Sequence, residues 1–531
     1  MSALRAEVPI DRLPGTTTLF RDFVARADAP VHRRLRGFRA QDEAWRHVLG
    51  TARGVDARLV ERMAAENQAL GASRETIERV RGLADGRTRA VITGQQPGVA
   101  GGPLLSLYKA ASAVALAREI EVRWKTPCVA VFWLGSDDDD FAEIRDLFLV
   151  SDTLSVVGVS LDGTAHAPGR RVGDVAGTAV ARSWDAVSPF LPKGDSAARI
   201  DAIVRGGDDL GRIAARVLME LAHGSIAVID GREPLLRDSA RTTILEFFDR
   251  EDAIRGLVVA GGDALLADGY HAQLDSSSDS GLFLVREGTR QRIPAEARAT
   301  ARAAFAHDVG AASPGVVARN LIQDSVFAPV AVVLGPAEIA YRAQLARVYD
   351  IMGVDTPVVF PRLGATFVPP AVAEAVERSG TDATLLATDP SEWVVRVMRS
   401  LESPRAAEAA RAFEGAFRAD AARFIESASG RLDPRAREKL ERRVADLANR
   451  VASVAQGAVE QDALAGASQW PWLARASDLF ARDGAPQERF LSALVPQTFH
   501  DHDAWGLVLE VASDHVRDAL DGTVLHRVYS R

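Results

Sequence analysis

The chain has a single cysteine, no long hydrophobic run and no excess of positive charge. Because Cys128 has no second cysteine to pair with, an internal disulfide is excluded and a reducing compartment is expected. The opening residues, MSALRAEVPIDRLPG, hold no apolar segment typical of a secretory signal. The longest apolar runs fall short of the ~20 residues of a membrane helix. We therefore expect a cytoplasmic protein without a membrane partner.

Several function classes are excluded in the same way. The net charge of −8, without a basic stripe, argues against nucleic-acid binding. No GxSxG, HExxH, CxxC or DFG-type motif occurs, so the common hydrolase and kinase signatures are missing. Cys128 lies in an apolar strand pattern, which favours a small buried hydrophobe over a nucleophile.

What is present indicates a large α/β protein. The 531 residues exceed one ordinary domain. Short apolar segments alternate with helical patterns, which is typical of a parallel sheet covered on both faces. A Rossmann-like core over residues 1–400 is the predicted fold, with inserted connective segments at about 150–320. The predicted strands are 90–93, 128–134, 226–230, 282–285, 330–334 and 357–360.

From residue 401 the composition changes to alanine, arginine and glutamate, which predicts a helical arm over 401–466. Gly430 and the Asp433-Pro434 pair mark the end of one helix and the start of the next. Apolar residues then recur at spacings of three and four, as in a coiled coil. The coiled coil could close within the chain or join two chains, and an ordinary helical hairpin is an equal alternative. Residues 467–531 are expected to pack back on the core.

A glycine-rich turn, VITGQQPGVAGGP over residues 91–103, follows one predicted strand and precedes a helix. Such a turn leaves backbone N–H groups free to bind phosphate or carboxylate. Its spacing matches neither GxxxxGK[ST] nor GxGxxG. The candidate binding residues in this turn are Gly94, Gln95, Gln96, Pro97, Gly98, Gly102 and Pro103.

Four consecutive aspartates, Asp137 to Asp140, follow the next strand. Like charges in a row repel, so the block needs cations or strong hydrogen bonds. Asp138 and Asp140 could hold Mg²⁺, or the block could bind a substrate ammonium. If the strand conformation continues, alternation lets two of the four side chains face one ligand. A solvated turn with Asp139 or Asp140 capping the next helix is the alternative.

Two further segments carry candidate residues. In LGPAEIAYRAQL, Gly335 makes a strand-to-helix turn, while Glu338 suits an amino group and Tyr341 lies on the neighbouring helical turn. The alternative roles are a first-turn helix acid and a packing tyrosine. In NLIQDSVF, Gln323 and Asp324 interrupt an apolar stretch and need partners, either structural or from a ligand.

Arg362 and His271 complete the candidates. Arg362 follows the strand at 357–360 and could pair with a substrate carboxylate, although a surface ion pair is the more common role. His271, in GYHAQL, is the histidine most suited to a functional role. The segments GQQPG, SDDDD, GPAE and PRLG each follow a predicted strand. Because parallel strands end at one edge of a sheet, we expect these segments to share one site.

Five blocks together resemble the bacillithiol-biosynthesis cysteine ligase family. They lie in the same order as in that family and span residues 92–492. Weaker similarities occur at GYHAQL and LFLVREGTR. The blocks are VITGQQPGVAGGP, FWLGSDDDDFAEI, SPGVVARNLIQDSVFAP, LGPAEIAYRAQL and GAPQERFLS.

The resemblance implies an amide-forming ligase that joins L-cysteine to glucosaminyl-malate. It further implies activation of the carboxyl by ATP, with Mg²⁺ as a second expected cofactor, and a homodimer through the arm. The residues that it assigns to catalysis are Asp137, Asp138, Asp140, Glu338 and Tyr341. The family block reads Glu-Asp-His-Asp, whereas Asp139 replaces the histidine here. That change leaves open a ligase with another acceptor amine, or a non-catalytic nucleotide-binding scaffold.

Overall fold

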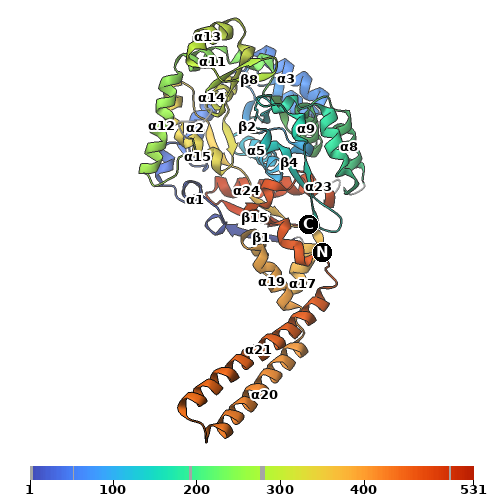
Figure 1. Cartoon of the computed structure of the whole chain (residues 1–531). Helices are drawn as coiled ribbons and strands as arrows, with labels where there is room; N and C mark the ends of the chain where they lie inside the picture. Colours follow the sequence, from blue (N-terminus) through green and yellow to red (C-terminus); the bar gives the residue numbers. More distant parts are fainter. Residues whose placement is uncertain (1–3, 52, 191–193, 275–280, 501–503) are drawn as a thin grey trace. The chain divides into compact units, whose positions relative to one another are not determined.

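The computed structural model of the chain describes residues 4–51, 53–190, 194–274, 281–500 and 504–531. These residues form two compact units (Figure 1). The core unit comprises the chain up to Pro369 together with Ala481–Arg531, and the arm unit comprises Pro370–Phe480. Both ends of the chain therefore belong to the core unit.

A five-stranded parallel sheet lies in the core unit. Valine, isoleucine and other apolar residues follow one another along the strands, because both faces of the sheet are buried. The predicted Rossmann-like α/β fold is confirmed. In spatial order the strands are β11 (Val358–Pro361), β10 (Ala331–Leu334), β2 (Arg89–Gln95), β3 (Cys128–Leu134) and β6 (Ala227–Asp230).

The order of these strands reverses at β2. From β2 the chain continues through β3 to β6 on one side, and it later returns to place β10 and β11 on the other side. Ligands of open α/β sheets bind at the carboxyl ends of the strands where such a reversal occurs. The residues after β2 and β10 therefore occupy the favoured position for a site.

Helix α5 (Leu104–Trp124) connects β2 to β3 and is buried along most of its length. It packs against both strands and also against α24 (Ala504–Leu520). Alanine, leucine and valine dominate its sequence because a helix covered on several sides has little surface to give to polar residues. The buried Lys109 in the second turn of this helix is therefore unusual.

One predicted strand lies outside the parallel sheet. Strand β7 (Leu282–Arg286) pairs antiparallel with β8 (Thr289–Gln291) and β9 (Ala312–Pro314). Glu287 and Gly288 join β7 to β8 and both have positive φ, as a tight two-residue hairpin requires. Apolar content identified this strand but could not show its direction, because the turn residues decide it.

The inserted segment after β3 is more regular than its sequence suggests. Strands β4 (Asp146–Val150) and β5 (Val156–Ser160) form a hairpin. Helices α7 (Gly177–Asp185), α8 (Asp195–Gly206) and α9 (Leu210–Leu221) follow. At the chain ends, β1 (Arg5–Pro9) and β12 (Ala365–Phe367) flank β15 (Leu525–Tyr529) in a separate sheet.

The other helices of the core unit cover and connect these sheets. Among them, α3 and α4 pack against β6 and β3. The remaining α-helices of the core unit are α1 (Thr18–Ala25), α2 (Glu43–Gly50), α3 (Ala57–Leu70), α4 (Arg74–Arg81), α6 (Phe141–Arg145), α10 (Pro234–Ser239), α11 (Arg241–Asp249), α12 (Glu251–Ala267), α13 (Arg298–His307), α14 (Val316–Phe327), α15 (Pro336–Gln344), α16 (Ala346–Met352), α22 (Gln487–Phe490) and α23 (Val495–His500).

In the arm unit, α20 (Pro404–Ser429) and α21 (Pro434–Ala467) pack against each other as a helical hairpin (Figure 1). Ser403 and Asp433 cap their first turns, and a proline follows each cap. Helices α17 (Pro370–Ser379), α18 (Leu385–Thr388) and α19 (Pro390–Ser400) complete the unit. Within the described residues, no helix is both long enough and apolar enough to span a bilayer.

Candidate functional site

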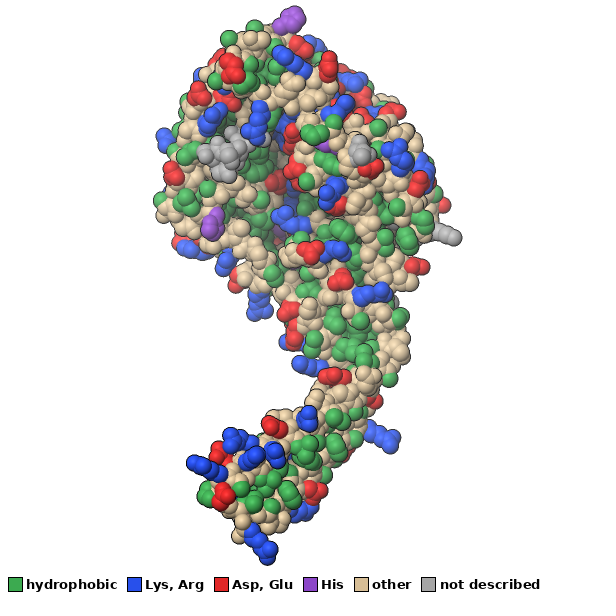
Figure 2. Space-filling model, in the orientation of Figure 1, with side chains coloured by type: hydrophobic (Ala, Val, Ile, Leu, Met, Phe, Trp, Pro, Cys, Tyr) green, Lys and Arg blue, Asp and Glu red, His purple; other side chains and the backbone are tan. Residues whose placement is uncertain are grey.

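A cavity of about 600 Å³ opens at the carboxyl ends of β2, β3 and β10. Figure 2 shows acidic and basic side chains gathered along a hollow in this part of the molecule. The segments that line it include the ends of these strands, the aspartate block, and the first turns of α14 and α15. The cavity thus lies at the reversal of strand order, where a ligand site is expected.

From the glycine-rich turn, Gly94, Gln95 and Gln96 line the cavity. The rest of the turn serves to pack the chain. A Cβ on Gly98 would lie 2.5 Å from Cα of Gly102, so the two backbones are in contact. The turn after β2 therefore contributes amide side chains to the cavity.

The N-terminus of α5 is occupied by protein groups. The Leu104 N–H donates to the Leu491 carbonyl at 2.6 Å, and the Ala493 N–H donates to the Gly102 carbonyl at 2.9 Å. At the start of this helix, where the sequence predicted an anion site, the first N–H is therefore bound by a carbonyl of the segment after α22. The predicted binding residues of the turn that do not line the cavity are Pro97, Gly98, Gly102 and Pro103.

Lys109 is a buried cation of the wall, at 3% exposure. Its Nζ donates to the Gly94 carbonyl at 2.8 Å and to Oε1 of Gln95 at 2.9 Å, and it lies 2.8 Å from Oε2 of Glu338. Burial lowers the pKa of Lys109, while the Glu338 carboxylate opposes that shift. Lys109 thereby joins the end of β2 to the first turn of α15.

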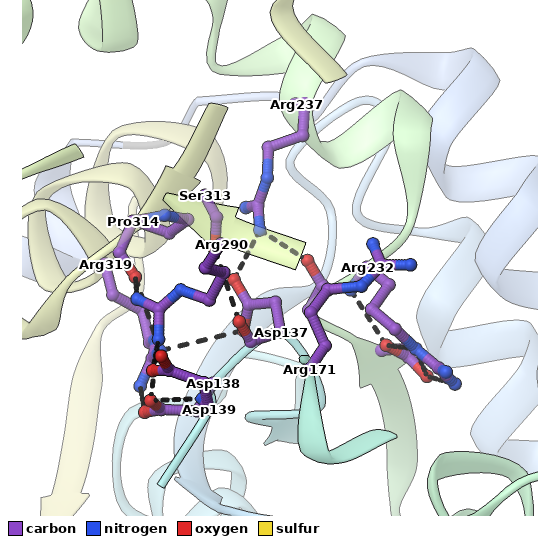
Figure 3. Close-up of polar contacts among 12 residues, drawn as sticks. Asp137, Asp138, Asp139, Arg171, Arg232, Arg237, Arg290, Ser313, Pro314 and Arg319 are labelled. Carbon is purple, nitrogen blue, oxygen red and sulfur yellow. Dashed lines mark hydrogen bonds and ion pairs between the residues drawn. The ribbon is translucent and has the colours of Figure 1, made fainter. Parts of the chain in front are cut away.

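The aspartate block divides into a buried part and a cavity-facing part (Figure 3). Asp137 is 1% exposed and its Oδ2 accepts a hydrogen bond from Arg237 at 2.5 Å. Asp138, Asp139 and Asp140 all line the cavity, so three side chains face it where strand alternation predicted two. The reason is a turn: the Asp138 N–H donates to the Gly135 carbonyl, which ends the extended strand.

Two arginines from distant segments compensate the charge of this block. Arg290 contacts Asp138 at 3.0 Å and also contacts Asp139, and Arg319 lies 3.0 Å from the other oxygen of Asp138 (Figure 3). Burial opposes ionisation of Asp138, but Arg319 and Arg290 outweigh it and lower its pKa to about 2. Asp138 is therefore ionised and fully engaged with protein cations.

These contacts do not fit a metal ion held by the protein at Asp138 and Asp140. Asp138 is already bound by two guanidinium groups. Asp140 accepts the Glu143 N–H at 3.3 Å and caps α6. Within the described ranges, no group of three or more His, Cys, Asp or Glu side chains is placed to hold a metal. The reaction proposed below therefore uses no metal ion bound by the protein.

Glu338 and Tyr341 meet at the start of α15. The Gly335 N–H donates to Oε2 of Glu338 at 2.7 Å. The same carboxylate oxygen therefore binds both the backbone of the turn and the Lys109 ammonium. Burial, followed by the charge of Glu338, raises the pKa of Tyr341. Gly335, Glu338 and Tyr341 all line the cavity. The first-turn helix role and the cavity position are combined in Glu338.

Arg362 lines the cavity, but its guanidinium is bound by a carboxylate of the chain. Nη1 and Nη2 contact Oε2 and Oε1 of Glu488 at 3.0 and 2.5 Å. Both side chains are largely buried, since Arg362 is 6% and Glu488 7% exposed. The bidentate carboxylate predicted for Arg362 is therefore supplied by α22.

The remaining predicted site residues, Gln323, Asp324 and His271, lie in different surroundings. Gln323 lines the cavity and donates to Asp324 at 2.9 Å. Asp324 is buried outside the wall, where it binds Arg342 and accepts from the Tyr349 hydroxyl at 2.8 Å. His271 is exposed and lies outside the wall. The polar pair of NLIQDSVF thus has one residue facing the cavity and one in a structural network.

Sequence reasoning missed five charged residues of the wall. Arg489 and Glu143 belong to blocks already singled out, GAPQERFLS and FWLGSDDDDFAEI, but they resemble ordinary helix residues. Arg319 lies in a third block. Arg290 ends LFLVREGTR, the segment with only a weaker similarity to the family, and Lys109 stands inside an apolar helix, where an isolated lysine was the available signal. The five residues are Lys109, Glu143, Arg290, Arg319 and Arg489.

Comparison with known proteins identifies the family of the chain. Residues 11–363 match the family model described as "Bacillithiol biosynthesis BshC, N-terminal Rossmann-like domain". The chain belongs to this family. The matched range covers all five strands of the parallel sheet and the aspartate block.

Relatives named "Putative cysteine ligase BshC" match over most of their length. The protein of Solibacter usitatus is 29% identical, over 82% of this chain and 86% of the relative. That of Koribacter versatilis is 30% identical, over 70% and 72%. Among solved structures, the match to Thermus thermophilus arginyl-tRNA synthetase covers 82% of each chain, at 11% identity and with a TM-score of 0.20.

Proposed function

We propose that this chain is a cysteine ligase that forms an amide between the carboxyl of L-cysteine and the amine of glucosaminyl-malate, with ATP activating the carboxyl. Membership of the bacillithiol-biosynthesis BshC family, whose relatives are named putative cysteine ligases, carries the proposal. The cavity supports it because it presents free charges of both signs to a ligand.

The acidic groups suit an amine. Glu143 and Asp140 line the cavity, and neither has a cationic partner within the described ranges. A carboxylate without a cation attracts an ammonium group. The acceptor named in the proposal, glucosaminyl-malate, carries the attacking amino group, so this side of the cavity suits its binding.

The basic groups suit carboxylate and phosphate. Arg489 is exposed, lines the cavity and has no carboxylate partner among the described residues. Gly315 and Val316 bring the first turn of α14 to the wall, and no side chain caps that turn. Its N–H groups and helix dipole favour an anion. These residues would hold ATP, which supplies the phosphoryl or adenylyl group that makes the cysteine carboxyl reactive.

Glu338 and Lys109 then serve to position groups in the cavity. Their ion pair, at 2.8 Å, leaves no full charge of its own to offer. It fixes the Gly94 carbonyl and the Gln95 amide at the end of β2. A rigid wall of this kind keeps polar groups in one orientation when a substrate binds.

We further propose that the arm unit joins two copies of the chain. Large apolar side chains remain exposed along the two long helices and their connection. Figure 2 shows hydrophobic side chains on the visible face of the arm. Exposed apolar surface of this extent marks an interaction site. The exposed residues are Phe413, Phe424, Leu432, Leu447, Val454 and Leu464.

Sedimentation equilibrium tests the dimer. The chain is expected to sediment as a dimer, and the double variant Phe424→Lys with Val454→Lys as a monomer. Arg475→Gln, an exposed change in the same unit, serves as the matched control. A wild-type chain that stays monomeric at micromolar concentration contradicts the dimer.

One incubation tests the ligase. Purified protein, ATP, Mg²⁺, L-cysteine and glucosaminyl-malate are combined, and products are followed by mass. The amide product is expected together with either ADP or AMP, and the nucleotide identifies acyl-phosphate or adenylate activation. If ATP is cleaved with cysteine but this acceptor is not consumed, a panel of other amines tests the related-ligase alternative. Nucleotide binding without any turnover contradicts the ligase.

A further inference from the structure

Glu143 differs from the other acidic residues of the cavity wall. Two of those residues, Asp138 and Asp139, pair with Arg290, and Glu338 pairs with Lys109. Asp140 is used as the cap of α6. The acidic residues of the wall are Asp138, Asp139, Asp140, Glu143 and Glu338. Glu143 alone among these described residues combines a cavity position with neither a cationic partner nor a helix-capping role.

The contacts of Glu143 hold it in place without neutralising it. Its Oε1 accepts a hydrogen bond from Nε2 of Gln95 at 2.9 Å, which ties α6 to the end of β2. Desolvation raises its pKa, and the charges of Asp140 and Asp138 raise it further, whereas Lys109 and the Gln95 amide lower it. The carboxylate is thus held at the cavity wall in a form that binds a proton more readily than an ordinary glutamate.

Two polar atoms at the same end of the cavity lack a partner. Nε1 of Trp133, on the second-last residue of β3, and Oε1 of Gln96 are both buried without a hydrogen bond to any described residue. Trp133 is 3% exposed, and both residues line the cavity. A buried donor and a buried acceptor left open are costly unless a ligand completes them. They mark the ends of β2 and β3, next to Gln95, as the place where a polar ligand binds.

We propose that Glu143 is the general base that accepts a proton from the attacking amine as the amide bond forms. This inference rests on the proposed ligase function and assigns a residue to its second step. The amine nitrogen forms a bond to the activated cysteine carbonyl carbon. The bond from that carbon to the phosphate or adenylate oxygen breaks, and the leaving group takes the electron pair. The amine proton passes to the Glu143 carboxylate.

A base is needed because the nitrogen gains positive charge as it attacks. Removal of its proton prevents return to the reactants, and such assistance contributes roughly 10²- to 10⁴-fold in rate. Asp140, whose Oδ1 accepts the Glu143 N–H at 3.3 Å, adds negative charge to the same part of the cavity wall. Formation of the activated carboxyl does not involve this proton, so loss of Glu143 should affect only the second step.

Hydroxylamine separates the two steps. It is uncharged at neutral pH and captures activated carboxyl groups as hydroxamates without help from a base. We compare Glu143→Gln with wild type for amide formation with glucosaminyl-malate and for hydroxamate formation from cysteine, ATP and hydroxylamine. The glutamine keeps the size of the side chain and can still accept from Gln95. Glu75→Gln, an exposed change in α4, is the control.

Glu143→Gln is expected to slow amide formation by about 100-fold or more, with hydroxamate formation within about twofold of wild type. Glu143→Asp, which keeps a carboxylate, should recover part of the loss. Equal losses in both assays would overturn the proposal, since they would assign Glu143 to binding or folding, and so would an unchanged rate of amide formation. If wild type forms neither product, the ligase function itself fails, and that result is distinct from a defect confined to Glu143→Gln.

Discussion

Two groups of charged residues lie at the wall of one cavity or directly behind it, and they differ in how their charge is balanced. Asp137, Asp138 and Asp139 are bound by arginines from α10, β8 and α14. In the second group, Glu143 and Arg489 have no ion-pair partner within the described ranges. The first group is completed by folding, and the second is left for a ligand. Neighbouring positions of one acidic block therefore serve stability and chemistry separately.

The largest effect should come from breaking the balanced group at its buried end. Asp137→Asn leaves Arg237 buried with the Gly231 carbonyl as its remaining close partner at 2.6 Å. An uncompensated buried charge costs roughly 3–5 kcal/mol. Urea unfolding should show a loss of that size. Asp152→Asn, an exposed change in the β4–β5 turn, should remain within about 0.5 kcal/mol of wild type. Equal losses in the two variants would show that the Asp137–Arg237 pair does not stabilise the fold.

How far the sequence predicted this division can be judged from single residues. The apolar runs located the parallel strands, and their carboxyl ends correctly brought Gln95, Asp138 and Glu338 to one edge. The sequence could not show that Asp137 and Asp138 point to different environments. That outcome depends on the turn at Gly135 and on Arg237, which is 100 positions away.

The ligand-facing residues were harder to recognise for another reason. Glu143 and Arg489 look like ordinary charged residues of short helices, and only their place in the fold leaves them without partners. Arg362 shows the reverse case, because an arginine well suited to a substrate carboxylate is already bound by Glu488. Charge compensation depends on contacts between distant segments, which a single sequence does not reveal.

A smaller effect follows from pH. The pKa of Asp138 is about 2 in the folded chain, below the roughly 3.9 of an unfolded aspartate. Its ionised form therefore adds stability above about pH 4, and that stability is lost as the pH falls toward 2. At pH 7, the free energy of unfolding of wild type should exceed that of Asp138→Asn by about 2–3 kcal/mol. Urea titrations at pH 7, 4 and 3 should show the difference shrinking; a constant difference would contradict the role of charge.

The ligand-facing group should respond in binding and not in stability. Arg489→Gln removes an exposed cation of the cavity. We expect KM for ATP to rise by about tenfold, which corresponds to about 1.4 kcal/mol, with an unchanged melting temperature. Arg475→Gln is again the matched control. A lowered melting temperature with unchanged KM would place Arg489 in the balanced group instead.

The smallest effect is expected at Asp139, where the two groups meet. Asp139 shares Arg290 with Asp138, and about a third of its side chain is exposed. Because Asp138 still holds Arg290 when Asp139 is neutral, Asp139→Asn should cost less than about 1 kcal/mol. The same change removes one negative charge from the wall, so ATP should bind slightly more tightly. Urea unfolding and nucleotide titration of one preparation check both effects, and a loss as large as that of Asp137→Asn would show that Arg290 depends on both carboxylates.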